Sequence, residues 1–174
     1  PSPVVRLGLA SGCQRLPLAA RKPILEGLVR HAEDANDHNL PFMVWYALEP
    51  VAADSPQWAL ELASAAKLPG VLINSVRRIA ALGTPESLER LVAAIDQAGS
   101  DADRLTILRA FNQSLQGRRT VDMPANWPAV YKKLRDGGDL DVGGQATRLA
   151  ATFGDPLALD FLRKVLAQAD LPMA

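Results

Sequence analysis

The sequence predicts an all-α protein: an α-α superhelix of about ten helices, paired in about five antiparallel hairpins. Residues 77–98 and 148–169 align without a gap at an offset of 71 residues, and eight of the 22 aligned positions are identical. A fainter copy lies one offset earlier, where Val5-Arg6 and Gly12 align with Val76-Arg77 and Gly83. Nearly every segment also spaces its apolar residues with a helical period, and none alternates long enough to form a strand. Internal similarity of this kind is typical of stacked supersecondary units.

Capping residues and glycines set the expected helix ends. Four prolines each follow a side chain that can cap a helix, and proline at the first helical position loses no hydrogen bond. These pairs are Ser2-Pro3, Ser55-Pro56, Thr84-Pro85 and Asp155-Pro156. Ser100 with Asp103 resembles a capping box. Glycines that mark helix ends stand at positions 83, 99, 117 and 154.

In chain order, the first four helices are expected to begin at Pro3, after Pro17, at Leu40-Pro41 and at Pro56, and the fifth to end before Gly83. The later ones show clear apolar faces, such as Leu88, Leu91 and Ile95 in one helix. The expected helices span residues 3–16, 18–32, 41–52, 56–67, 70–82, 86–98, 101–116, 127–136, 142–153 and 156–168. Residues 117–126 are expected to form a surface loop. One offset therefore spans two hairpins of roughly 35 residues each.

Composition limits the classes of function. The chain has 174 residues, 48% of them hydrophobic, which favours a packed core over disorder. With 19 basic and 19 acidic residues the formal net charge is zero, which argues against a nucleic-acid partner or an anionic membrane. No apolar run is long enough to span a bilayer. The single cysteine, Cys13, lies among small residues and is expected to be a packed side chain.

The chain is expected to be one helical-repeat domain, residues 1–174, cut from a longer protein. It begins at Pro1 and is already in the repeat pattern by Val5. A targeting signal would then lie outside these residues, so the compartment is not evident from the fragment itself.

The recurring unit resembles a known repeat. Residues 147–151 (TRLAA) lead to residues 153–156 (FGDP), followed by Ala158-Leu159 and Leu162. This is similar to the HEAT repeat of the phycobilisome-lyase-like type, in which small residues precede a Gly-Asp-Pro turn and a leucine-rich helix. The resemblance implies an ARM/HEAT-type solenoid. The earlier copy departs from it at Thr84, which replaces the turn aspartate, and residues 101–136 match poorly.

A second resemblance covers mainly residues 24–52. The stretch from His31 to Pro41, followed by residues 45–50 (WYALEP), is similar to the HEAT region of large bacterial multidomain proteins. Those proteins carry a predicted membrane-bound dehydrogenase domain, then helical repeats, then a cytochrome c domain. The resemblance implies a periplasmic or exported protein with a neighbouring haem domain. This chain has no Cys-x-x-Cys-His, so no cofactor is expected within it.

The only dense polar constellation lies between residues 31 and 39. It contains His31, Glu33, Asp34, Asp37, His38 and Asn39. One hypothesis is a metal site formed by His31, Asp34 and His38, or a ligand pocket beside Trp45 and Tyr46. The favoured interpretation is structural. His31 suits the carbonyl end of helix 18–32, Asp37 or Asn39 caps the next helix, and Asp34 ties the loop to its own backbone.

Other candidate residues also have a structural and a functional interpretation. Trp45 and Tyr46, with Phe42, are more typical of core aromatics than of a recognition platform. Glu49 is a candidate partner for an arginine of a neighbouring repeat. Arg6, Arg77 and Arg148 share one repeat position. Each is expected to be a structural residue that binds carbonyls or a carboxylate between stacked units, with a row of anion-binding arginines as the alternative.

The leading functional hypothesis is a non-catalytic helical-repeat scaffold whose partner is protein, either its own flanking domains or another chain. The chain has no Gly-x-Ser-x-Gly motif and only two histidines, both in one loop, so no catalytic residue is assigned. The alternative is a metal- or ligand-binding module centred on residues 31–46 in service of a redox enzyme. A third hypothesis, a bilin-lyase-like enzyme, rests on the fold resemblance alone.

Overall fold

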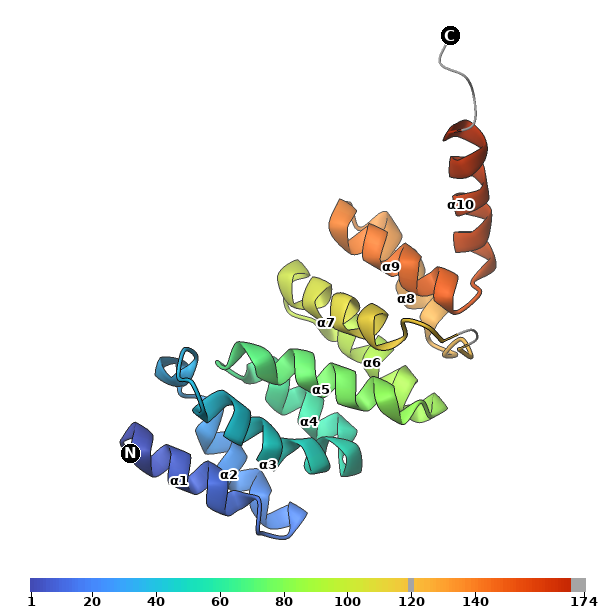
Figure 1. Ribbon diagram of the computed structural model, residues 1–174. Coiled ribbons are helices and arrows are strands. Elements are labelled where there is room, and N and C mark those ends of the chain that lie inside the picture. Colours follow the sequence, from blue (N-terminus) through green and yellow to red (C-terminus); the bar gives the residue numbers. More distant parts are fainter. Residues whose placement is uncertain (119–120, 170–174) are drawn as a thin grey trace.

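The computed structural model describes residues 1–118 and 121–169 (Figure 1). This part of the chain forms ten α-helices and one short 3-10 turn, and no strand. The elements are α1 (Pro3–Cys13), α2 (Leu18–Leu28), η1 (Ala32–Asp34), α3 (Leu40–Asp54), α4 (Pro56–Ala65), α5 (Pro69–Leu82), α6 (Pro85–Gln97), α7 (Asp101–Ser114), α8 (Trp127–Asp136), α9 (Leu140–Thr152) and α10 (Pro156–Ala169). The predicted all-α fold class is confirmed.

The helices form a stack of antiparallel hairpins in two layers. The odd-numbered helices α1, α3, α5, α7 and α9 follow one another in one layer, and α2, α4, α6 and α8 form the other layer, while α10 stands to one side (Figure 1). Each odd-numbered helix packs extensively on the next, whereas successive even-numbered helices touch much less. The odd-numbered layer is therefore the more closely packed of the two.

The 71-residue offset corresponds to two hairpins of this stack. The recurring segments 77–98 and 148–169 fall on α5–α6 and α9–α10, and the fainter copy falls on α1. Helices α1, α5 and α9 are therefore equivalent members of the odd-numbered layer. Each helix contacts only helices near it in the chain, as expected of a repeat protein.

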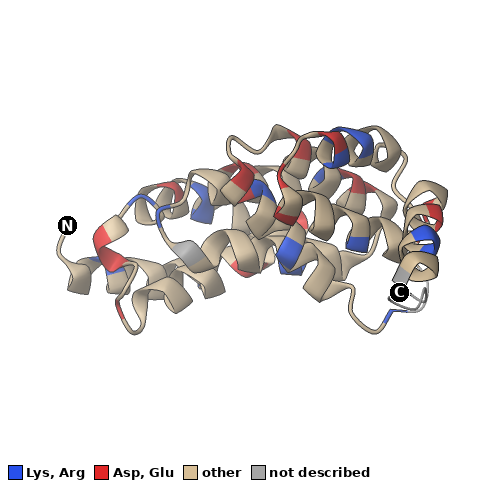
Figure 2. Cartoon of the chain, turned by 90° about the horizontal axis from the view of Figure 1, so that it is seen from above, with Lys and Arg blue, Asp and Glu red and all other residues tan. Residues whose placement is uncertain are grey.

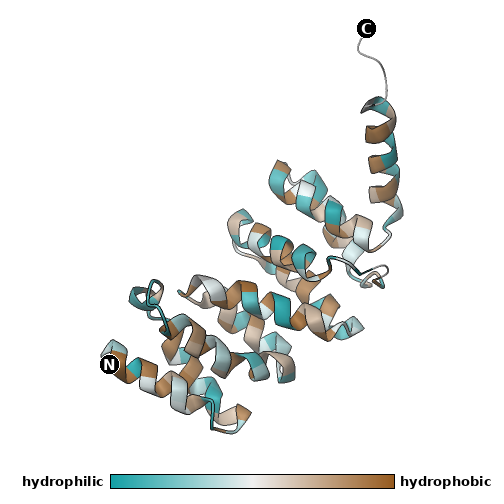
Figure 3. Ribbon diagram, viewed as in Figure 1, coloured by the Kyte–Doolittle hydropathy of each residue, from teal (hydrophilic) through white to brown (hydrophobic). Residues whose placement is uncertain are grey.

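Two hydrophobic clusters fill the space between the layers. The first is formed by α1 to α5 and includes Ala10, Leu25, Val44 and Leu48. The second runs from α4 to α10 and includes the aromatic residues Phe111, Trp127, Tyr131 and Phe153. Cys13 is buried in the first cluster, and this burial raises the pKa of its thiol. Figure 3 shows bands of hydrophobic residues along α10 as well as on the other helices.

Most of the predicted caps are present. The side chains of Ser2, Thr84, Ser100 and Asp155 each accept a hydrogen bond from a backbone N–H in the first turn of the helix that follows. Ser55 was expected to do the same, but its hydroxyl bonds instead to Asp54 and to the ammonium group of Lys22. Gly83, Gly117 and Gly154 have positive φ angles, as the end of a helix requires, whereas Gly99 does not.

Two helices end earlier than the sequence predicted. The first ends at Cys13 rather than residue 16, and the second at Leu28 rather than residue 32. At the first site Pro17 has no N–H with which to continue the helix, and it disfavours helical geometry at Leu16. The carbonyl oxygens left free there, those of Gln14 (2.7 Å) and Leu16 (2.9 Å), accept hydrogen bonds from the guanidinium of Arg21, which is largely buried. It also donates to the carbonyl oxygen of Ala47 at 3.1 Å, which joins this turn to α3.

The other helix boundaries lie within two residues of the expected ones. The loop expected at residues 117–126 lies between α7 and α8, and residues 119–120 are outside the described part. Along the described helices, no stretch is both long and apolar enough to cross a bilayer.

Candidate functional site

The polar loop between α2 and α3 contains a buried ion pair. Asp34, at the end of η1, is only 3% exposed, although a lone aspartate is rarely buried. Its two carboxylate oxygens accept hydrogen bonds from Nε (2.6 Å) and Nη2 (2.5 Å) of Arg6 on α1. Arg6 also donates to the carbonyl oxygen of Pro1 at 2.5 Å. The hydrogen bonds to Asp34 raise the pKa of Arg6 further above its ordinary value.

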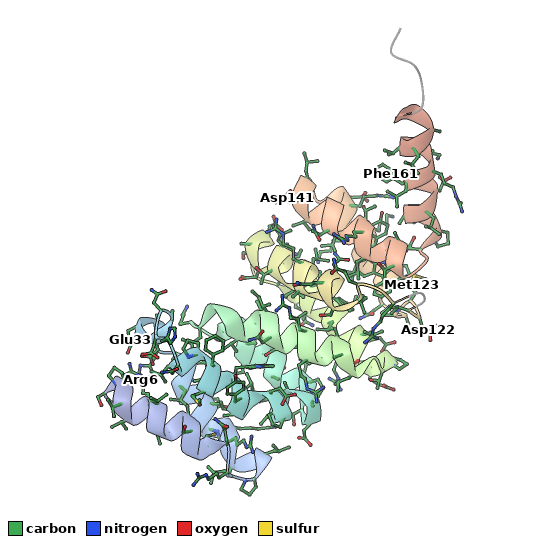
Figure 4. All side chains as sticks on the ribbon, viewed as in Figure 1. Arg6, Glu33, Asp122, Met123, Asp141 and Phe161 are labelled. Carbon is green, nitrogen blue, oxygen red and sulfur yellow. The ribbon has the colours of Figure 1, made fainter. Side chains whose placement is uncertain are left out.

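This pair corrects the expectation for Asp34. Its side chain does not tie the loop to its own backbone, because both oxygens face a guanidinium 28 residues away in the chain. Glu33, which is exposed, adds a weaker contact at 3.5 Å to the same guanidinium. Figure 4 shows Arg6 and Glu33 side by side where α1 meets the loop. The loop is therefore fastened to the first helix of the stack.

Asp37 caps α3, and Asn39 does not. One oxygen of Asp37 accepts hydrogen bonds from the backbone N–H groups of Asn39 and Leu40, each at 2.8 Å. Asn39 occupies the N-cap position without a side-chain bond. The bond from Leu40, followed by that from Asn39, lowers the pKa of Asp37 below its ordinary value of 3.8. Asp37 is therefore the one of the two predicted residues that caps α3.

The two histidines do not converge on Asp34. His31 precedes η1 instead of ending a helix, and its Nδ1 lies 2.8 Å from Oε1 of Glu33. The pKa of Glu33 is lowered by its own backbone N–H first and by His31 second. His38 is exposed. Within residues 1–118 and 121–169, no three histidine, cysteine, aspartate or glutamate side chains are arranged to hold a metal ion.

Replacing Asp37 with alanine tests the structural interpretation of this loop. We expect the melting temperature at neutral pH to fall by about 2–4 °C, because two backbone donors at the start of α3 lose their acceptor. Because folding lowers the pKa of Asp37, its carboxylate stabilises the folded protein fully at pH values above the ordinary pKa. This stabilisation is lost as the pH falls through the lower pKa of the folded state. The difference between parent and variant should therefore shrink below about pH 4. His38→Ala is the matched control and should melt like the parent in thermal scans monitored by circular dichroism. Equal melting of Asp37→Ala and His38→Ala would contradict the cap.

The aromatic residues of α3 are only partly in the core. Trp45 packs against the first hydrophobic cluster, but Phe42 and Tyr46 are more than half exposed. The expectation that all three are core residues is wrong for these two, because α3 turns this side of its surface to solvent. Glu49, on the same helix, forms an ion pair with Arg78 of α5 at 2.5 Å. The predicted partnership of Glu49 with an arginine of the next unit is thus observed.

The shared position of Arg6, Arg77 and Arg148 does not give them a shared environment. Arg6 is buried, whereas Arg77 and Arg148 are exposed. Arg77 donates to the side-chain oxygen of Gln113 on α7. The expectation of a structural contact between units is therefore wrong for Arg148. For Arg77 it is met only by this one contact at the surface. For Arg77 the reason is that α6 leads into α7 through the short connection 98–100, so no loop equivalent to residues 29–39 supplies a carboxylate beside α5.

Two other arginines bind backbone carbonyls between units, and the sequence analysis missed both. One is Arg21, described above. The other is Arg104 on α7, which donates to the carbonyl oxygens of Ile95 (3.1 Å) and Ala98 (3.0 Å) at the end of α6. They are 83 residues apart in the numbering, so the 71-residue alignment gave no signal for them. Each closes a helix end that lacks a left-handed glycine.

Both ends of the stack expose apolar side chains at positions that are buried in its interior. Leu166 on α10 is 65% exposed, whereas its repeat equivalent Ile95 on α6 is fully buried where α7 packs. Val5 on α1 is 51% exposed, whereas its equivalent Val76 on α5 is fully buried. Further exposed apolar residues on these two end helices are Val4, Leu9, Leu157, Phe161 and Val165. In Figure 4, Phe161 projects from α10, which stands apart from the other helices.

Comparison of the chain with protein-family models, with curated proteins and with solved structures finds no match.

Proposed function

We propose that this chain is a non-catalytic scaffold whose two end faces dock onto protein. The N-terminal face is formed by Val4, Val5 and Leu9 of α1, and the C-terminal face by Leu157, Phe161, Val165 and Leu166 of α10. The observation that carries the proposal is the contrast between Leu166 and Ile95, since the same repeat position is exposed on α10 and fully buried on α6. Contiguous exposed apolar surface is typical of interaction sites. The terminal units of a solenoid that ends in solvent are expected to present polar outer faces instead.

We expect the partner to present a helical surface. Inside the stack, the repeat positions equivalent to these end-face residues are covered by an amphipathic helix. On α6 that cover is α7, which packs on both α5 and α6. We propose that flanking domains of a longer polypeptide or another protein supply the corresponding helices. From the resemblance of residues 24–52, we place the module in a periplasmic or exported, haem-containing dehydrogenase-like protein, with repeats of the HEAT type. A Cys-x-x-Cys-His motif encoded in the flanking sequence would support that placement, and its absence from the full gene would count against it.

The purified protein can test the end faces without a known partner. The N-terminal face of one molecule can pack on the C-terminal face of another, much as successive units pack within the stack. We expect sedimentation velocity to show reversible association that increases with protein concentration. Leu166→Glu and Val5→Glu should each leave the chain monomeric, since a charge on a docking face must be desolvated. An equal mixture of the two variants should form dimers, because each retains one intact face.

The matched control is Met123→Glu, which introduces the same charge at an exposed apolar residue of the loop before α8 (Figure 4). It should associate like the parent. A parent chain that stays monomeric at the highest attainable concentration would contradict docking through the ends. So would a Met123→Glu variant that dissociates as completely as Leu166→Glu.

A further inference from the structure

Three arginines that lack an acidic partner lie on or just after α7 and on α9. Arg109 lies on α7, Arg118 lies just after α7, and Arg148 lies on α9. All three are exposed, and none forms an ion pair within the described part of the chain. In contrast, Arg6, Arg78 and Arg104 are each paired with a carboxylate. The chain as a whole is neutral, and its charges are interspersed along the stack (Figure 2), so this cluster is a local excess.

The three arginines border two adjoining surface hollows that share Arg148. One hollow, of about 250 Å³, is lined by Arg109, Asn112, Gln113, Gln116, Gln145 and Arg148. The other, of about 300 Å³, extends past Gln116 to Arg118 and Thr152. Neither is lined by a carboxylate, whereas Arg118 also borders a third hollow that is lined by Glu89 and Asp122. The nearest acid on α9 is Asp141, which precedes Gln145 by one turn and lies at the far end of the helix (Figure 4).

Hydrogen bonds between neighbouring helices hold the floor of these hollows in place. Asn112 on α7 is 7% exposed, and its amide nitrogen donates to the backbone oxygen (2.9 Å) and the side-chain oxygen (3.1 Å) of Gln145 on α9. Gln113 accepts from Arg77 of α5, so three successive odd-numbered helices are linked side by side. These hydrogen bonds therefore fix the spacing of α7 and α9, the helices that carry Arg109 and Arg148. A fixed spacing reduces the entropy cost of binding.

We propose that the face formed by Arg109, Arg118 and Arg148 binds an acidic segment of a protein partner. Each guanidinium can accept a carboxylate in a bidentate pair, which is stronger and more directional than a single contact. The amide nitrogens of Gln113, Gln116 and Gln145 offer donors for the main-chain carbonyls of the same segment. A single-stranded nucleic acid fits less well, because neither hollow has an aromatic side chain on which a base would stack.

The test uses a fluorescein-labelled peptide of ten glutamates and fluorescence anisotropy at low salt. The parent protein should bind it, and affinity should fall as salt is added, because exposed charges are screened. Arg148→Gln should weaken binding about tenfold, the equivalent of one charge-assisted hydrogen-bond pair. Arg109→Gln/Arg148→Gln should abolish it. Arg90→Gln is the matched control, since Arg90 is an exposed arginine on α6 of the other layer, and it should bind like the parent.

Three results would overturn the proposal. They are no binding by the parent, equal weakening by Arg90→Gln and Arg148→Gln, and tighter binding of a ten-nucleotide thymidine oligomer than of the peptide. All of these substitutions are at exposed positions, so circular dichroism should show unchanged folding. The sedimentation test of the end faces uses other residues and no peptide. Failure of one experiment therefore leaves the other unaffected.

Discussion

Replacing Asp34 with alanine is expected to lower the free energy of unfolding by about 3 kcal/mol. The carboxylate is buried and bonded twice to Arg6, so its removal leaves a guanidinium in the interface between α1 and the 31–39 loop without its partner. An unpaired buried charge costs far more than the pair itself contributes. Urea denaturation followed by circular dichroism measures the change.

A double variant separates the contribution of the Arg6–Asp34 ion pair from the cost of leaving one of its two charges unpaired. Arg6→Met/Asp34→Leu replaces both charges by apolar groups of similar length, and it should recover most of the stability lost in Asp34→Ala. Glu33→Ala removes only the exposed neighbour of the same guanidinium and should melt like the parent. If Glu33→Ala and Asp34→Ala were equally destabilised, the buried geometry of Asp34 would have no energetic importance.

The sequence predicted the helices well because each of its signals is local. Apolar spacing identifies a helix within one segment, and a cap such as Thr84 or Asp155 acts within three residues of itself. The internal alignment added long-range information of one kind, since it showed that α5–α6 and α9–α10 are equivalent units. The contacts of Arg21 were missed because they join the turn after α1 to Ala47 on another hairpin.

The candidate site was less predictable for the same reason. Asp37 was among the predicted caps because its partners are two and three residues away. The role of Asp34 depends on Arg6, 28 residues distant, and neither residue type indicates which of several charged residues it will meet. Arg6, Arg77 and Arg148 show the limit of repeat reasoning. An alignment transfers the position of the backbone but not the neighbouring loop, and here the loop supplies the carboxylate.

The second large effect is expected at Trp127, the first residue of α8. Its side chain is fully buried, stacks on Tyr131 at 5.7 Å between ring centroids and meets Phe153 edge-on at 5.3 Å. Phe111 of α7 completes the cluster, 5.9 Å from Phe153. We expect Trp127→Ala to cost about 3–5 kcal/mol in urea denaturation, as is usual for a large aromatic removed from a core. The indole N–H has no hydrogen-bond partner in the described structure, so the loss is one of packing.

This loss should be confined to one part of the stack, because each helix contacts only its near neighbours and the aromatic cluster belongs to the second hydrophobic core. Native-state hydrogen exchange of Trp127→Ala should show faster exchange in α7 to α9 and little change in α1 to α3, where the first core is intact. Trp127→Phe is the control, since it keeps a ring in the cluster, and its exchange should lie between those of the parent and the alanine variant. The proposed arginine face is carried by α7 and α9, the helices that are expected to loosen, so Trp127→Ala should also weaken binding of the glutamate peptide although Trp127 is not part of that face. Uniform loss of protection along all ten described helices would instead mean that the chain unfolds as a single cooperative unit, and the division into two cores would then have no consequence for stability.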